Sequence, residues 1–272
     1  MQRPPTRGLF VTGTDTGVGK TILSAALVAR MVAEGELVRA HKPVVTGVEE
    51  LRPTGRPPAS AGATSASAGA TPASAGPVGP AAPRGERTAA WPPDHELLAM
   101  VANMTPAEVS PLRYVPPVSP HLAAELAGES IDPLRLLDAV NVARADARML
   151  VVEGVGGLLT PLAEDFTVRD YAAALGLPVV IAARTGLGTI NHTLLTLQSA
   201  RAAGLDVRAV VLTPWPARPS RLQQSNRETI ARLGAIEVES LAAVTSPDRD
   251  CLARAGAALP WRRWLEAPSP VL

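Results

Sequence analysis

A chain of 272 residues, 46% of them hydrophobic, permits one or two domains with a sizeable core and excludes a chain disordered throughout. Its formal net charge of +1, from 26 basic and 25 acidic residues, gives no electrostatic footprint for nucleic acid or for an anionic membrane surface. A single cysteine, Cys251, excludes an internal disulfide and a thiolate metal site. With no apolar run of about 18 residues and no secretory signal, we expect a cytoplasmic protein.

The first predicted elements are a buried strand over residues 9–11, a glycine-rich turn over 13–21 and a helix over 22–30. Such a turn aims backbone N–H groups and the positive end of the helix dipole at one small volume, which suits a phosphate. Lys20 adds an ammonium for the outer phosphates, and Thr21 adds a hydroxyl for Mg²⁺. The turn is one residue longer than the usual phosphate-binding motif, so we interpret it as a long variant. The alternative is a glycine turn that only lets the helix pack on the strand.

A second strand is predicted over residues 37–45, running out to Thr46 and Gly47. Lys42 lies near its far end, directly before Pro43, which fixes the local backbone. Ligands of open α/β sheets collect beyond the carboxyl ends of the strands, where the phosphate-binding turn also lies. Lys42 is therefore a candidate ligand-binding residue, and the alternative is a solvated lysine at a strand end.

Residues 52–90 consist mostly of Pro, Ala, Gly, Ser and Thr, a composition that cannot form a packed core. We therefore predict a flexible surface insertion there. After it, Asp94 begins a helix behind two prolines, and its carboxylate has two interpretations, an N-cap or a magnesium ligand. Two further helices are predicted over 121–127 and 132–147, after an extended crossing over 111–120.

Glu153 ends a predicted buried strand over residues 149–153 and is followed by glycines. Parallel strands are buried on both faces, so a carboxylate at the end of one needs a partner. Mg²⁺ held through the phosphate-binding turn is a candidate partner, as for a Walker-B-type acid. The alternative is a structural carboxylate.

The remaining chain alternates as a doubly wound sheet does, which predicts an α/β fold with a mostly parallel sheet and helices on both faces, as one domain over 1–272. Helices are predicted over 167–175, 190–203 and 220–233, and strands over 178–183 and 207–212. The glycine turn at 184–192 leads into a helix N-terminus, which is another potential anion site. After Pro247 the pattern is weak, and we expect Trp261 and Trp264 to cover apolar surface.

Five motifs together resemble those of dethiobiotin synthetases in order and approximate spacing, over roughly residues 8–233. They are Gly-Thr-Asp-Thr-Gly-Val-Gly-Lys-Thr at 13–21, His-Lys-Pro-Val-Val-Thr-Gly at 41–47, Ser-Pro-His at 119–121, Glu-Gly-Val-Gly-Gly at 153–157 and Leu-Gly-Thr-Ile-Asn-His at 187–192. ParA/MinD-type ATPases of the same superfamily carry a signature lysine where this chain has Asp15, which argues against the alternative function, a partner-driven ATPase switch. A third possibility, an amidotransferase-like relative, usually needs a nucleophilic cysteine, and Cys251 lacks that context.

The resemblance implies a P-loop fold and a ligase that joins 7,8-diaminopelargonate and CO₂ into dethiobiotin, with Mg²⁺ and ATP, in biotin synthesis. One amine captures CO₂ as a carbamate, the carbamate attacks the γ-phosphate, and the second amine displaces phosphate to close the ureido ring. Catalysis of this kind is mostly positioning and charge stabilisation.

The resemblance also implies roles for individual residues. Lys20, Lys42 and Thr16 are the expected catalytic residues, with both lysines flanking the γ-phosphate and the carbamate. The expected magnesium ligands are Thr21, Asp94 and Glu153. The expected nucleotide-binding residues are Thr16, Gly17, Val18, Gly19, Lys20, Thr21, Ile22, Asp94, Glu153, Gly154, Gly156 and Thr213. The expected substrate-binding residues are Thr46, Gly188, Thr189, Ile190 and Asn191, the last four reaching the substrate carboxylate from the other subunit of a homodimer.

One position departs from the resemblance. Many members end the strand over 207–212 with Asn-Asp, whose side chains read adenine, whereas this chain has Thr213 and Pro214. A bidentate amide is lost, and proline cannot donate a backbone hydrogen bond. We therefore predict weaker discrimination for adenine and use of other nucleoside triphosphates.

Overall fold

The computed structural model describes residues 7–48, 91–145 and 147–266. The predicted insertion at 52–90 lies outside the described residues. Within those ranges, no helix is both long and apolar enough to cross a membrane.

A six-stranded sheet forms the centre of the molecule, with every neighbouring pair of strands parallel. The strand order is β10-β9-β8-β1-β5-β2. The strands are β1 (Arg7–Gly13), β2 (Val38–His41), β5 (Met149–Glu153), β8 (Val179–Ala183), β9 (Val207–Trp215) and β10 (Glu237–Ala242). Because the chain moves from β1 to one side of the sheet and later to the other, the carboxyl end of β1 lies at the point where ligands of such sheets bind.

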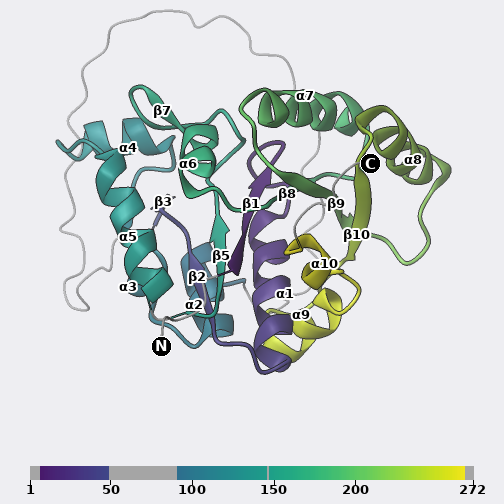
Figure 1. The fold of residues 1–272 in the computed structure, drawn as a ribbon, viewed down its shortest axis with the longest axis horizontal. Coiled ribbons are helices and arrows are strands. Elements are labelled where there is room, and N and C mark those ends of the chain that lie inside the picture. Colours follow the sequence, from purple (N-terminus) through teal and green to yellow (C-terminus); the bar gives the residue numbers. More distant parts are fainter. Residues whose placement is uncertain (1–6, 49–90, 146, 267–272) are drawn as a thin grey trace, which may run out of the picture.

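Helices cover both faces of the sheet, as Figure 1 shows. Leu9 and Val11 of β1 belong to one buried cluster and Phe10 to the other, as the alternation of side chains along a strand requires. The first cluster packs under α1 (Lys20–Ala33), α2 (Asp94–Ala102), α3 (Pro106–Val109), α9 (Arg249–Gly256) and α10 (Trp261–Trp264). The second packs under α4 (Pro120–Leu126), α5 (Pro133–Ala145), α6 (Val168–Leu175), α7 (Thr189–Ala202) and α8 (Arg221–Gly234). The prediction of a doubly wound α/β sheet is confirmed.

The predicted second strand is divided in two at Lys42 and Pro43. Its first part is β2, while the second part, β3 (Val44–Thr46), leaves the main sheet and pairs with β4 (Leu112–Tyr114). Proline has no N–H for the sheet, and the N–H of Lys42 donates to the carbonyl of Val109 at 2.9 Å instead. Lys42 therefore lies just beyond the main sheet, and its side chain contacts Glu153 at the carboxyl end of β5.

Other strands have no counterpart in the sequence prediction. β6 (Pro161–Ala163) and β7 (Phe166–Thr167) form a short antiparallel hairpin, and β10 adds an edge to the main sheet. β10 carries Glu237 and Glu239 on an exposed edge, and both pair with Arg263. Charges on an edge strand protect it from pairing with other chains, but they also weaken the apolar signal of a strand.

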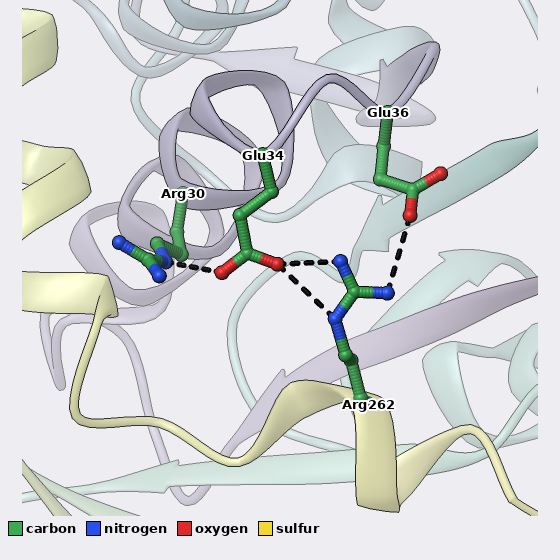
Figure 2. Close-up of polar contacts among 4 residues, drawn as sticks. All are labelled: Arg30, Glu34, Glu36 and Arg262. Atoms are coloured by element: carbon green, nitrogen blue, oxygen red, sulfur yellow. Dashed lines mark hydrogen bonds and ion pairs between the residues drawn. The ribbon is translucent and has the colours of Figure 1, made fainter.

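The chain after Pro247 folds back onto α1. Trp261 and Trp264 are 4% and 1% exposed within the cluster under α1, so they lie in the core and not merely over it. Arg262 joins α10 to the end of α1, since its guanidinium donates to Glu34 at 2.6 and 3.1 Å and to Glu36 at 3.3 Å (Figure 2). Arg30 holds the other oxygen of Glu34 at 2.5 Å. These ion pairs are exposed, so the buried tryptophans contribute most of the free energy that holds the C-terminal segment against α1.

Candidate active site

The loop between β1 and α1 has the conformation of a phosphate cradle. Gly17 and Gly19 have φ angles of 68° and 93°, and Gly19 is the N-cap of α1. A Cβ at Gly19 would lie 2.6 Å from Cγ2 of Thr213, so this glycine serves both the turn and a close approach. The loop therefore exposes backbone N–H groups at the start of a 14-residue helix, where an anion is favoured.

Lys20 is the first residue of α1 and is only 6% exposed. Its Nζ donates to the carbonyl of Asp15 at 2.8 Å, across the phosphate-binding loop. Burial has the largest influence on this ammonium and lowers its pKa to about 8, while Glu153 raises the pKa and Lys42 lowers it. A desolvated ammonium at the mouth of the loop is a strong partner for a phosphate.

Glu153 is the last residue of β5 and is fully buried. Its Oε1 accepts hydrogen bonds from the Thr21 hydroxyl at 2.8 Å and from Lys42 Nζ at 2.6 Å. Its Oε2 is buried and has no hydrogen-bond partner. The buried carboxylate has a charged partner in Lys42, whereas the predicted partner was Mg²⁺, which stays a prediction.

Lys42 lies between β2 and β3 and is 4% exposed. Its Nζ contacts Glu153 as above and also Asp94 Oδ2 at 2.5 Å. Burial by itself would lower the pKa of Lys42, but the charges of Glu153 and Asp94 and the hydrogen bonds to them raise it to about 12. Lys42 is therefore a fixed cation between two carboxylates, and its interpretation as a solvated lysine at a strand end is wrong.

Asp94 does not cap its helix, contrary to one of its two interpretations. It is the first residue of α2, the N-cap is Pro93, and no side chain caps this end. Burial raises the pKa of the Asp94 carboxyl, but the Lys42 charge and hydrogen bonds from Lys42 and Thr21 outweigh burial and hold the pKa below its usual range. The carboxylate is thus ionised and directed toward the phosphate-binding loop.

The oxygen atoms of Thr21, Asp94 and Glu153 form a donor set that suits Mg²⁺. One hydroxyl and two carboxylates are hard ligands, and the Thr21 hydroxyl donates to Glu153 at 2.8 Å and lies close enough to Asp94 to lower its pKa. The unpartnered Oε2 of Glu153 is a buried oxygen to which a cation would supply the missing contact. The described residues hold no cluster of three or more His, Cys, Asp or Glu side chains, so a metal here depends on the Thr21 hydroxyl.

A cavity of about 860 Å³ opens above this cluster, and we call it the phosphate-loop cavity. It is lined by the predicted residues Thr16, Gly17, Gly19, Lys20, Thr21, Ile22, Lys42, Thr46, Asp94 and Gly156. Segments far apart in the sequence complete its wall, among them Trp91, residues 117–120 and Thr160. Its volume lies in the range of about 300–1,000 Å³ that is usual for small-molecule sites.

A second cavity of about 700 Å³ lies against the first, and we call it the Thr213 cavity. Its wall contains Gly17, Val18, Gly19, Ile22, Trp91, Arg184, Thr185, Gly186, Thr213, Pro214, Ala243 and Val244. The two cavities share Gly17, Gly19, Ile22 and Trp91. β9 runs on through Thr213 and Pro214 to Trp215, which brings both residues beside the loop.

Some predicted residues do not line either cavity. Gly154 is enclosed by Val168 and Phe10, and Glu153 lies behind Thr21 and Lys42. Gly188, Thr189, Ile190 and Asn191 begin α7, as predicted from the glycine turn, but they lie outside both cavities. Within one copy of the chain, Thr46 is thus the expected substrate-binding residue that lines the phosphate-loop cavity.

Several cavity residues were missed by the sequence prediction, and Trp91 and Arg184 are the two with the largest side chains. Trp91 follows the predicted insertion and is 38% exposed, and Arg184 follows β8 and donates to the carbonyl of Thr16 at 3.0 Å. A basic residue at the carboxyl end of a predicted strand could have indicated Arg184. For Trp91 the only signal is a large aromatic side chain in a chain with 3% aromatic residues.

Comparisons with known proteins agree with this geometry. A family model described as an AAA domain matches residues 7–249. The chain is 37% identical to an ATP-dependent dethiobiotin synthetase of Anaeromyxobacter sp. (strain Fw109-5) over 240 residues, which are 85% of this chain and 91% of the relative. It is 36% identical to the protein of that name from Mycobacterium sp. (strain KMS), over 88% of this chain and 89% of the relative. For the Bacillus subtilis (strain 168) protein of that name, the identity is 29%, over 85% of each chain.

Among solved structures, a ParA-family ATPase from Chlorobium tepidum TLS aligns with this chain over 93% of this chain and 89% of the ATPase chain. The TM-score is 0.46 and the sequence identity is 11%. This likeness is too low to bear on function.

Proposed function

The chain belongs to the family of ATP-dependent dethiobiotin synthetases, and from this premise we propose that it is a ligase that closes a cyclic urea. Its substrates are 7,8-diaminopelargonate, CO₂ and a nucleoside triphosphate. The products are dethiobiotin, the nucleoside diphosphate and phosphate. The reaction adds a carbonyl between two amines, and water is formally removed at the expense of the γ-phosphate.

One observation carries the proposal. Lys42 reaches the wall of the phosphate-loop cavity as a cation held by Asp94 and Glu153, while Lys20 reaches the same cavity from the phosphate-binding loop. Two buried ammonium groups at one cavity suit a reaction in which both reactants are anions, a carbamate and a phosphate. The second ammonium of this chain comes from the end of β2, whereas the switch ATPases carry their signature lysine in the loop, where this chain has Asp15.

The two lysines have different roles in this account. Lys20, on the loop, holds the outer phosphates together with the backbone N–H groups of Thr16 to Lys20. Lys42 orients the carbamate oxygen for attack on the γ-phosphorus and stabilises negative charge as the P–O bond forms. The second amine then attacks the carbamoyl carbon, and phosphate leaves with the oxygen that it received from the carbamate.

Magnesium fits the oxygen donors of Thr21, Asp94 and Glu153 described above. When bound, Mg²⁺ neutralises charge on the β- and γ-phosphates. Thr21 and Asp94 line the cavity directly, whereas Glu153 fixes Thr21 and Lys42 from behind. Glu153 therefore also positions the catalytic lysine.

We propose that the diamine binds on the side of the phosphate-loop cavity that Thr46 lines. We propose that the enzyme is a cytoplasmic homodimer and that the α7 start of the second subunit binds the substrate carboxylate. The N-terminus of this 14-residue helix favours an anion, and Gly188, its N-cap, has no side chain to occupy that end.

Thr213 and Pro214 support weak discrimination for adenine. Both line the Thr213 cavity, and Thr213 is packed against Gly19 with 3% exposure. A hydroxyl and a proline ring cannot form the bidentate contact that an amide side chain makes with adenine. We expect CTP and GTP to support turnover within about tenfold of ATP, whereas a preference for ATP of more than about 100-fold would contradict this.

The function is tested by incubating the enzyme with the diamine, bicarbonate, Mg²⁺ and nucleotide, followed by mass spectrometry. The expected product contains one C=O in place of two hydrogens of the diamine, and phosphate release should depend on the diamine. Equal phosphate release without the diamine, and no such product, would favour the switch ATPase.

A further inference from the structure

The Thr213 cavity has a wall that is poor in groups able to read the edge of a base. None of its twelve lining residues is Asn, Gln, Asp or Glu, the side chains that read the edges of adenine and cytosine. Its polar side chains are two threonines and Arg184, and Arg184 already donates to Thr16. The rest of the wall is glycine and apolar side chains, so its chemistry suits the face of a ring better than its edge.

Neighbouring groups that could read a base are also engaged. The Asn226 amide donates to the carbonyls of Thr185 and Gly186 at 3.0 and 3.1 Å. The Gln223 amide lies 3.4 Å from the Thr185 hydroxyl. Both amides thus stabilise the turn after β8, and neither side chain lines the cavity.

Trp91 is the one aromatic side chain in the wall of the Thr213 cavity, among the residues that the structure describes. It also lines the phosphate-loop cavity, so it stands where the two cavities meet. With 38% exposure it retains free indole surface, and the cation–π contacts among the described residues involve Trp215 and Trp261 instead. Every base has a π-face, so stacking on an indole binds nucleotides without selecting one base.

The chain next to Trp91 is stiff and leads directly to the catalytic cluster. Pro92 and Pro93 fix two consecutive φ angles, and Asp94 follows as the first residue of α2. Pro92 and Asp94 both line the phosphate-loop cavity. A nucleotide that has its phosphates on the loop and its base against Trp91 would therefore meet this segment twice, at the base through Trp91 and near the phosphates through Asp94.

We propose that Trp91 is the base-stacking residue of this enzyme and that nucleotide recognition relies on the face of the base instead of its edge. This inference rests on the proposed function for the placement of the phosphates, and it deepens that function by assigning its nucleotide specificity.

The test measures equilibrium binding of ATP, GTP and CTP, with inorganic tripolyphosphate as a ligand that has no base, to the full chain by titration calorimetry without the diamine. Trp91→Ala should weaken all three nucleotides by about tenfold or more and leave tripolyphosphate unchanged, because stacking is lost and the loop is not. Trp91→Phe should remain within about threefold of the wild type. Trp215→Phe is the matched control, since Trp215 lines neither cavity. Its ring centroid lies 6.0 Å from Cζ of Arg227, a contact away from the nucleotide site.

Several outcomes would overturn the inference. Unchanged nucleotide affinity in Trp91→Ala would do so, as would a loss confined to one base, which indicates reading of an edge. An equal loss for tripolyphosphate would show that the substitution displaces Asp94 or the loop instead. Failure of the wild type to bind any nucleotide would refute the proposed function and this inference together, whereas nucleotide binding without dethiobiotin formation would refute the ligase alone.

Discussion

Replacing Lys42 by methionine should separate the structural role of this lysine from its catalytic role. The substitution keeps most of the buried stem and removes the ammonium that lies 2.5 Å from Asp94 and 2.6 Å from Glu153. Removing one partner of a buried ion pair leaves an uncompensated charge and costs about 3–5 kcal/mol. Here the charge left behind is on Glu153, which is fully buried and has one oxygen without a partner.

Urea unfolding at neutral pH without Mg²⁺ measures this cost. Arg39→Met is the matched control, because Arg39 lies on β2, just before Lys42 in the chain, and pairs with Glu108 at 3.5 Å on the surface, where a pair contributes about 0–1 kcal/mol. The double variant Lys42→Met/Glu153→Gln should lose less than the sum of the single variants. A free energy of unfolding for Lys42→Met within about 1 kcal/mol of the wild type would refute the reasoning.

Turnover of Lys42→Met should fall at least about 100-fold. Nucleotide affinity should change little, because the loop backbone and Lys20 bind the phosphates. Product formation is measured by mass spectrometry and nucleotide binding by calorimetry on the same preparation. An active Lys42→Met enzyme would contradict the role assigned to this lysine.

Two further predictions concern buried positions. Burial lowers the pKa of His41 to about 4 from 6.5, so the fold favours the neutral imidazole, and the free energy of unfolding should fall by about 2 kcal/mol as the pH falls from 6.5 to 4.5. His41→Met should remove most of this loss in urea titrations at both pH values, and an equal loss in the variant would show that other groups cause it. Gly19→Ala should weaken nucleotide binding more than tenfold, since φ is 93° and the new Cβ meets Thr213. Gly35→Ala, also at positive φ but with nothing within 4 Å, should leave binding unchanged, and equal losses in both variants would contradict the argument.

The parts of the fold that the sequence predicts well are those with local signals. Residues 9–11 and 149–152 are uninterrupted apolar runs, and the structure places both at the centre of the sheet, within β1 and β5. The glycine turn between β1 and α1 was predictable because its glycines and its Lys-Thr ending are close together in the sequence, within residues 13–21. Since parallel strands end at the same edge, the approach of Glu153 to Thr21 follows from these two predictions.

Contacts between distant segments could not be predicted from local patterns. Asp94 was a possible helix cap by its position, but its carboxylate bonds to Lys42, 52 residues away in the sequence. This outcome depends on how α2 packs beside β2, which no local signal contains. Trp91 reaches the Thr213 cavity in the same way, through the packing of segments that are remote in the sequence.

The strand β10 and the terminal helices were missed because their patterns are weak. Glu237 and Glu239 interrupt the apolar signal of an edge strand, and their partner Arg263 comes from the far end of the chain. α10 is a single turn of four residues, too short for a periodic signal, although Trp264 is among the most deeply buried large side chains. The single-domain organisation and the homodimer stay predictions.

The most direct test of the ligase is an incubation with bicarbonate labelled with ¹³C and ¹⁸O, stopped before the label exchanges with water. If the carbamate attacks the γ-phosphorus beside Lys20 and Lys42, the ¹³C should appear in the ureido carbon of dethiobiotin and one ¹⁸O in the released phosphate. Phosphate without ¹⁸O, or released with no labelled ureido product, would contradict the account.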